Sequence, residues 1–300
     1  MLRRVNQSIG HLYVDKITPR RIQALMDELR EPGGNLRRPE RGLVARTLRH
    51  YLNMLSSVFQ YAVRMEMIER NPCRTVILPP EETREKQCYT PDEAQAFLDA
   101  LADAPLKWQT FFTLALFGGY RREELCGFEF DDFNFDACTV TVRRTSVYTP
   151  ESGVVTVPTK TMKSARTLKL PSWIFVLVKR LQMEQIENRL KFGDQWHECG
   201  RLFTKLDGSP IHPARAYEWL QVFSKRKNLP FYGVHQFRHL NASLLIYNGE
   251  DVRTVASMLG HASPATTLNI YAHTFETAQA RASEALAEKL PVKFVQRKKA

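Results

Sequence analysis

The sequence predicts an α+β fold that is mostly helical, and three observations lead to this class. Apolar residues recur with helical spacing at both ends of the chain, short segments rich in Val and Thr lie only in the middle, and the 300 residues suffice for two domains. Helices and strands do not alternate along the chain, which excludes a doubly wound parallel sheet. We expect a small helical domain over residues 1–80 and a larger domain over residues 81–300, the latter with a small antiparallel sheet.

The first domain is predicted to consist of helices. The segment 17–30 has Thr18 as an N-cap and Pro19 at the first helical position, followed by one apolar face. Gly and Pro mark residues 31–42 as a loop, and residues 43–67 repeat the helical pattern. Three prolines and a charge run make residues 71–87 a linker.

The charge of the chain is concentrated in this first domain. The net charge is +11, and residues 1–80 contain 14 Lys and Arg against 7 Asp and Glu, with 13 of the 14 being arginine. Arginine binds phosphate with a planar, bidentate fork, which favours a nucleic-acid partner over a merely solvated helical surface or an anionic membrane. We assign the DNA-phosphate contacts to Arg20, Arg21, Arg37, Arg38, Arg46 and Arg49.

Several protein classes are disfavoured by what the sequence lacks. It has no apolar run that could span a bilayer and no signal-peptide pattern at its first residues. Its five cysteines are scattered and never form a CxxC pair, which argues against a disulfide framework or a cysteine zinc site and favours a reduced, cytoplasmic setting. No Walker loop or carboxylate cluster for magnesium is present, so we expect no metal and no cofactor.

The second domain is predicted to begin with a helix, continue through strands and end in helices. Thr90 and Glu93 form a capping box, and residues 106–117 follow the pattern of a buried helix. Segments 138–145, 153–160 and 166–171 are the expected strands. The last two are expected to pair as a hairpin with Lys160 and Lys163 at its tip, and the chain is mostly helical from residue 172 onward.

Polar residues at four places in this domain could carry chemistry. Arg121 follows a glycine pair at a predicted helix start, where it could equally form a surface pair with Glu124. His235 and Arg238 share one helical face, a weak signal by itself that suits binding of a phosphate. Lys160, considered without the other motifs, would be interpreted as a solvent-exposed lysine at a hairpin tip.

The fourth place is the stretch LGHASPATTLNIYAH, residues 259–273. Gly260 is a predicted helix C-cap, Ser263 an N-cap and Pro264 the first residue of the next helix. His261 lies on the turn between the two helices. Tyr271, taken alone, would be a core aromatic.

Taken together and in this order, these motifs resemble the tyrosine recombinase, or phage integrase, family, including integrases of conjugative transposons and phages. The resemblance rests on GYRREEL at 119–125, HQFRH at 235–239 and LGH followed by a tyrosine at 259–271, and it covers most of the chain. Tyr120 and Phe237 replace the usual aliphatic residues. Part of the family's core-binding domain and the separate arm-binding domain of many integrases are missing from the start, so the chain resembles a truncated form.

The resemblance implies a site-specific recombinase that cuts and rejoins DNA through a 3′-phosphotyrosine, for integration or excision of a mobile element. Tyr271 would be the nucleophile, His235 the general base and Lys160 the general acid. The remaining implied site residues are Arg121, Arg238 and His261 on the phosphate and Glu124 behind Arg121.

Two other functions stay open: DNA relaxation of the type IB topoisomerase kind, and a non-catalytic architectural role in DNA binding. The family implies double-stranded recombination sites, a tetramer joined through the C-terminal tail, and an excisionase or DNA-bending protein as a further partner. It also implies a bacterial, nucleoid-associated location and no membrane contact.

Overall fold

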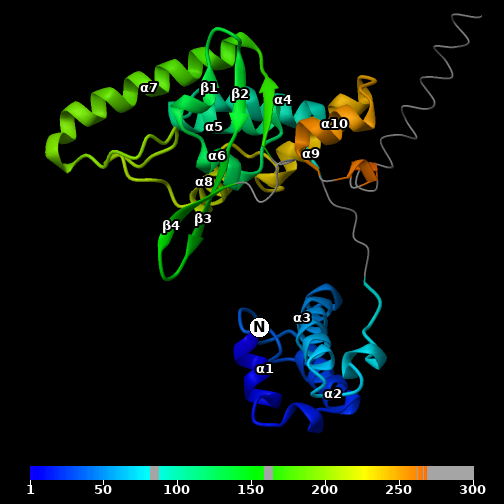
Figure 1. The fold of residues 1–300 in the computed structure, drawn as a ribbon. Helices are drawn as coiled ribbons and strands as arrows, with labels where there is room; N and C mark the ends of the chain where they lie inside the picture. The colour runs from blue at the N-terminus through cyan, green and yellow to red at the C-terminus, as the bar shows by residue number, and fades with distance from the viewer. Residues whose placement is uncertain (82–87, 159–164, 262, 266, 269–300) are drawn as a thin grey trace, which may run out of the picture. The chain divides into compact units, whose positions relative to one another are not determined.

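The computed structural model describes residues 1–81, 88–158, 165–261, 263–265, 267 and 268. The chain forms two compact units, Met1–Lys86 and Gln87–Ala300, the first of them helical and the second mixed (Figure 1). The predicted α+β class, mostly helical with a small antiparallel sheet, is confirmed. Within the described residues, no helix has both the length and the apolar composition needed to cross a membrane.

The first unit packs three helices around one apolar core. They are α1 (Leu2–Ile9), α2 (Pro19–Arg30) and α3 (Ala45–Arg64), with short 3-10 helices at Val14–Lys16 and Pro72–Thr75. The predicted N-cap is confirmed, because Thr18 Oγ1 accepts a hydrogen bond from the Arg21 N–H at 3.4 Å. The apolar face of α2 is fully buried and consists of Ile22, Leu25, Met26 and Leu29.

The arginines of this unit that we assigned to DNA contacts are exposed on α2, α3 and the loop between them. Arg49 pairs with Glu81 at 2.7 Å, so part of its charge is neutralised within the chain. The exposed set comprises Arg20, Arg21, Arg37, Arg38, Arg46 and Arg49.

In the second unit, the helices surround a core rich in aromatic residues. The predicted capping box of α4 is confirmed: the Thr90 N–H donates to Glu93 Oε2 at 2.8 Å, and the Glu93 N–H donates to Thr90 Oγ1 at 3.2 Å. The helices are α4 (Pro91–Leu101), α5 (Leu106–Gly118), α6 (Arg122–Gly127), α7 (Ser172–Phe192), α8 (Ala214–Arg226), α9 (His235–Tyr247) and α10 (Val252–Leu259), with 3-10 turns at Phe130–Asp132 and Gly193–Gln195.

The strand pairing differs from the sequence prediction. Strands β1 (Phe133–Asn134), β2 (Thr139–Val142) and β5 (Arg166–Lys169) form one antiparallel sheet in the order β1-β2-β5, and β3 (Arg144–Thr149) pairs with β4 (Gly153–Pro158) in another. The predicted hairpin of segments 153–160 and 166–171 is therefore wrong. The predicted single strand 138–145 is also wrong, because Arg143 separates β2 from β3 and the chain leaves one sheet for the other there.

The physical reason is the turn after β3. Gly153 has φ +68°, a backbone conformation that favours glycine, and it lets β4 fold straight back on β3. Strand β5 then joins β2, where its buried Leu168 lies opposite the buried Val140. Lys160 and Lys163 lie outside the described residues, in the segment that connects the two sheets.

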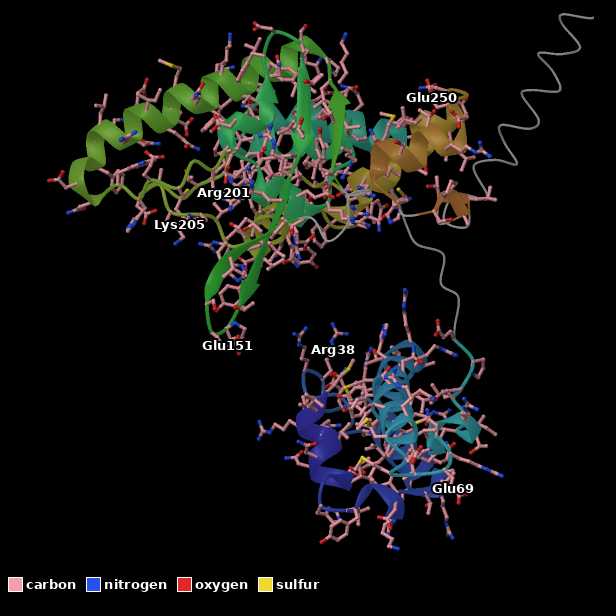
Figure 2. All side chains as sticks on the ribbon, in the orientation of Figure 1. Arg38, Glu69, Glu151, Arg201, Lys205 and Glu250 are labelled. Atoms are coloured by element: carbon pink, nitrogen blue, oxygen red, sulfur yellow. The ribbon has the colours of Figure 1, made fainter. Side chains whose placement is uncertain are left out.

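The β3–β4 hairpin projects from the second unit, with Glu151 near its tip (Figures 1 and 2). A two-stranded hairpin is marginal in isolation, so its base needs support. Arg201 supplies it with hydrogen bonds to the Gly127 carbonyl and to Thr156 Oγ1 on β4. On the other strand, Arg144 pairs with the buried Asp132 at 2.9 Å, so both strands are tied to the core.

An aromatic cluster fixes the start of α9 in the core. Phe237 is fully buried, and its ring centroid lies 4.7 Å from that of Tyr89, 4.9 Å from Phe97 and 5.5 Å from Phe112. Aromatic rings at such distances add to the free energy gained by burying their surface. Because Phe237 stands between His235 and Arg238 in the sequence, this packing sets the orientation of the whole first turn of the helix.

We expect Phe237→Ala to lower the free energy of unfolding by about 3–5 kcal/mol, because it removes a fully buried ring and leaves a cavity. Urea denaturation followed by tryptophan fluorescence measures this loss. Tyr247→Ala on the same helix, whose side chain is about half exposed, is the control and should cost much less. Equal losses in the two variants would show that the cluster does not hold the helix.

Candidate active site

Two glycines place Arg121 at the start of α6. Gly119 follows α5 with φ +58°, a conformation that strains other residues, and a Cβ there would lie 2.7 Å from Asn241 Oδ1 and force that side chain to move. Arg121 then caps α6. Its backbone N–H donates to Glu124 Oε2 at 2.9 Å, and its Nη1 donates to Glu124 Oε1 at 2.8 Å. The predicted position of Arg121 at a helix start is observed, and Glu124 is its ion-pair partner.

The first turn of α9 carries the predicted histidine and arginine. Arg238 is buried, and its guanidinium donates to the Gly119 carbonyl at 2.7 Å and to the Leu259 carbonyl at 2.5 Å. His235 is exposed one turn earlier, and its ring meets that of His239 edge-on, with centroids 4.9 Å apart. Arg238 thus joins the end of α5 to the end of α10.

Residues from separate parts of the site meet at the end of α10. Gly260 has φ +64°, which confirms the predicted C-cap. The Gly260 N–H donates to the Ser257 carbonyl and the His261 N–H to the Ala256 carbonyl, both at 2.9 Å. This is the Schellman arrangement, which satisfies two of the carbonyls that a helix end leaves without intrahelical partners.

The next three carbonyls each accept a hydrogen bond from a different arginine. Arg166 Nε donates to the Met258 carbonyl at 2.7 Å, and Arg121 Nη2 donates to the Gly260 carbonyl at 3.1 Å. Arg238 donates to the carbonyl of Leu259, the residue between Met258 and Gly260. A helix C-terminus carries partial negative charge, so it is a favourable place to gather cations.

Arg166 is the residue that sequence reasoning missed. It is the first residue of β5, its side chain is only 7% exposed, and it pairs with both oxygens of Glu124, at 3.0 Å and 2.8 Å. Its guanidinium carbon also lies 5.7 Å from the ring centroid of Tyr120. The local sequence RTLKLP indicates only a strand, because Glu124 and Met258 are both distant from this arginine in the sequence.

Glu124 is the carboxylate that these arginines share. Burial opposes its ionisation, but the hydrogen bonds and charges of Arg166 and Arg121 outweigh burial and hold the pKa of this carboxyl below its ordinary value. Glu124 is therefore ionised at neutral pH. Glu124 pairs with two of the three guanidiniums, those of Arg121 and Arg166, so among these side chains positive charge is in surplus.

His261 is held neutral by its surroundings. Burial, together with the charges of Arg238, Arg121 and Arg166, lowers the pKa of its imidazole from 6.5 to about 4. Its Nδ1 lies 2.8 Å from Oγ1 of the fully buried Thr267. A neutral imidazole with one nitrogen engaged by a hydroxyl keeps the other nitrogen for a ligand.

The structure thus brings together Arg121, Glu124, Arg238 and His261 of the predicted site, with His235 one helical turn from Arg238. Lys160 and Tyr271 lie outside the described residues. The predicted Ser263 cap is present, since Ser263 Oγ accepts from the Ala265 N–H at 3.2 Å.

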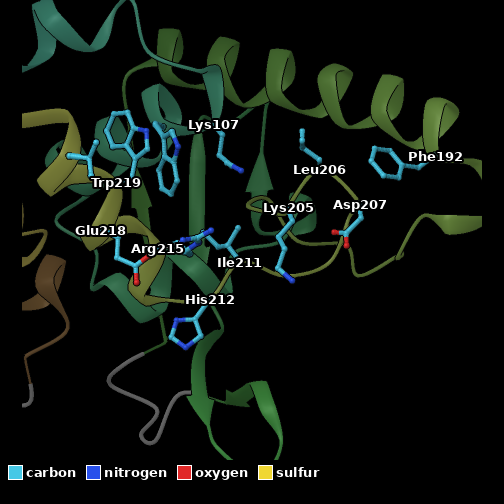
Figure 3. A pocket seen from close by; sticks show the side chains of 12 residues that line it. Lys107, Phe192, Lys205, Leu206, Asp207, Ile211, His212, Arg215, Glu218 and Trp219 are labelled. Carbon is cyan, nitrogen blue, oxygen red and sulfur yellow. Dashed lines mark hydrogen bonds and ion pairs between the residues drawn. The ribbon is translucent and has the colours of Figure 1, made fainter. Parts of the chain in front are cut away.

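A groove of about 830 Å³ lies elsewhere in the second unit, between α5, α8 and the loop that follows α7 (Figure 3). Its walls are largely apolar, with the stacked rings of Trp108 and Trp219 5.0 Å apart, and cationic groups such as Lys205 stand at its edge. None of the predicted site residues that the structure describes lines it.

Comparison with known proteins places these residues in context. The profile of the phage integrase family matches residues 87–277 of the chain. The ICEBs1 integrase of Bacillus subtilis is 27% identical over 277 residues, which cover 92% of this chain and 72% of that protein. A XerC-like tyrosine recombinase of Caldanaerobacter subterraneus is 29% identical over 265 residues, which cover 82% of this chain and 67% of that protein.

Solved structures share the fold. The Tn1549 transposon integrase in complex with transposon right end DNA aligns with a TM-score of 0.77 at 22% identity, over 97% of this chain and 91% of that one. A lambda integrase tetramer bound to a Holliday junction aligns with a TM-score of 0.60 at 17% identity, over 90% of this chain and 68% of that one.

The site and these relatives together define a tyrosine recombinase, an enzyme that transfers DNA strands. The chain belongs to the phage integrase family. Site-specific recombination, predicted from the resemblance, is thereby confirmed, and the relaxation and purely architectural alternatives are not favoured.

We expect the His261 ring to remain neutral as the pH falls from 6.5 to about 4, because its pKa lies at about 4. Since the folded state resists protonation there, the contribution of this group to stability is complete above pH 6.5 and is lost as the pH falls toward 4. NMR titration of the imidazole, assigned with His261→Gln, measures the midpoint. Arg121→Gln removes one cation and should raise it, and a midpoint of 6.5 in the unmodified protein would contradict the burial of this ring.

Proposed function

We propose that this recombinase cleaves DNA by attack of the Tyr271 hydroxyl on a phosphodiester, during integration or excision of a mobile element. The observation that supports the proposal is the convergence of Arg121, Arg238 and His261 on the end of α10. These side chains come from three separate helix ends, and their shared chemistry is recognition of a phosphate.

The arginines stabilise the charge that develops during attack. In-line displacement at phosphorus places negative charge on the non-bridging oxygens, and preorganised cations lower its energy without reorganisation. Arg121 uses two side-chain nitrogens in its contacts with Glu124 and Gly260, and a guanidinium has five N–H donors in all. Donors therefore remain for phosphate while the side chain stays anchored.

The two histidines have different roles at the phosphate: His261 donates a hydrogen bond and His235 acts as the general base. The role of His261 requires the tautomer in which the Thr267 hydroxyl donates a hydrogen bond to its Nδ1. The ring proton then lies on Nε2, where it hydrogen-bonds a phosphate oxygen. His235, exposed at the start of α9, accepts the proton of the Tyr271 hydroxyl as general base. Removing this proton makes the phenol, with an ordinary pKa of about 10, a competent nucleophile.

Lys160 protonates the departing 5′ oxygen, which would otherwise leave as a poor alkoxide. The products are a 3′-phosphotyrosine and a free 5′ hydroxyl. Because the phosphotyrosine retains the energy of the broken bond, the same site can rejoin the strand to another 5′ hydroxyl without ATP. Side-chain cations supply the charge stabilisation, and we propose no metal or cofactor.

The first unit is proposed as the core-binding domain and the second as the catalytic domain. The exposed arginines of α2, α3 and the loop between them bind the DNA phosphates. Four copies assemble on two recombination sites, joined by the tail after Tyr271, whose apolar positions include Phe275 and Leu286. An excisionase or DNA-bending protein would set the direction of the reaction, at the nucleoid of a bacterial cell.

We expect Tyr271→Phe to bind DNA normally and to form no covalent adduct, because only the attacking oxygen is removed. A pool of random duplexes incubated with the unmodified protein, followed by denaturation and sequencing of the DNA that stays attached, identifies a cleavable site. The same duplex then tests the variant. Tyr247→Phe is the control and should still form the adduct. An adduct that survives in Tyr271→Phe and disappears in Tyr247→Phe would reassign the nucleophile.

We expect Lys160→Ala to slow cleavage by the ~10²–10⁴-fold typical of a lost general acid. A duplex with sulfur in place of the bridging 5′ oxygen should restore much of the rate, because a thiolate leaves without a proton. Arg121→Ala and Arg238→Ala should not be rescued, since they lose charge stabilisation. Rescue of Lys163→Ala in place of Lys160→Ala would show that the other lysine is the acid.

A further inference from the structure

Arg166 lies at the centre of the cluster, although it belongs to none of the motifs that identify the family in this sequence. Its guanidinium bonds both oxygens of Glu124, and its Nε donates to the Met258 carbonyl at 2.7 Å. We propose that Arg166 is a positioning residue of the phosphate site, an inference that rests on the function proposed above.

Arg166 acts first on Arg121, through Glu124. The carboxylate of Glu124 accepts from the backbone and the side chain of Arg121 while Arg166 holds its other side. With Arg166 in place, Glu124 cannot rotate away from α6. Arg121, which is the more exposed of the two arginines, is thereby kept in one orientation.

Its second action is on the turn that carries His261. Met258 lies on the last turn of α10, and Gly260 follows the helix. A Cβ on Gly260 would lie 2.9 Å from Nη1 of Arg166, so this guanidinium packs directly against the turn. One side chain from β5 therefore links the element bearing Arg121 to the element bearing His261.

The guanidinium is suited to this task and an ammonium is not. A planar fork can bond two carboxylate oxygens and a carbonyl in one plane, whereas a lysine provides a point charge on a flexible chain. The charge of Arg166 also contributes to keeping His261 neutral. Lysine at this position would keep the charge and lose most of the geometry.

The test compares the cleavage rates of Arg166→Gln, Arg166→Lys and the unmodified protein. The substrate is the cleavable duplex identified from the random pool. Single-turnover cleavage should fall about 10²-fold in Arg166→Gln, the cost of a small misplacement of catalytic groups, with DNA affinity little changed. Arg166→Lys should recover part of the rate. Sulfur at the bridging 5′ position should not rescue Arg166→Gln, because a misplaced cation is not a missing proton.

Arg201→Gln is the matched control. Arg201 is as buried as Arg166, with 7% of its side chain exposed, and it also bonds a backbone carbonyl and pairs with a glutamate, but at the base of the β3–β4 hairpin. We expect a similar loss of thermal stability in both Gln variants and a loss of cleavage rate only in Arg166→Gln. Equal cleavage rates in the two, compared below their melting temperatures, would overturn the proposal.

The route through Glu124 is tested by a double variant that leaves no unpaired buried carboxylate. Glu124→Gln combined with Arg166→Gln should cleave no more slowly than the slower single variant, because the residues act as one unit. Multiplicative losses, or rescue of Arg166→Gln by the sulfur substrate, would overturn this route.

A final measurement needs no DNA and separates this inference from the proposed function. In the free protein, NMR titration of His261 should show a higher pKa in Arg166→Gln, a smaller change in Arg166→Lys and none in Arg201→Gln. An unchanged pKa in Arg166→Gln would overturn the placement of Arg166 beside the turn. Failure of the unmodified protein to form any adduct would instead contradict the proposed function.

Discussion

The site depends on the way a helix end holds cations. At the end of α10, three successive carbonyls accept hydrogen bonds from Arg166, Arg238 and Arg121. Carbonyls carry no net charge, so they fix the guanidiniums without cancelling them, whereas a carboxylate on each arginine would leave little attraction for phosphate. Glu124, a buried carboxylate that pairs with both Arg121 and Arg166, offsets part of the repulsion among the guanidiniums.

The rest of the second unit serves to bring distant segments to that helix end. Gly119 turns the chain sharply after α5, and the aromatic packing of Phe237 orients the first turn of α9. The β2–β5 pairing delivers Arg166 from a strand. The geometry of the arginine cluster is thus a property of the tertiary packing, although Arg121 and Arg238 each lie in a short local motif.

The features that could be predicted from the sequence are those with local causes. The caps at Thr18, Thr90 and Gly260 depend on side chains within a few residues, and they were predicted correctly. The strand partners could not be predicted, because pairing depends on which apolar faces meet across the fold. The role of Arg166 could not be predicted for the same reason, because Glu124 and Met258 lie 42 and 92 residues away from it in the sequence. The roles of Lys160 and Tyr271 rest on the resemblance and stay predictions.

Within the described part of the chain, the β3–β4 hairpin pairs with itself and with neither edge of the three-stranded sheet. Its base is anchored by Arg201 and Arg144, while the tip near Glu151 is exposed. Residues can be added or removed at such a tip in pairs without shifting the register of any strand in the core. The length of this hairpin is therefore decoupled from the packing that holds the arginine cluster.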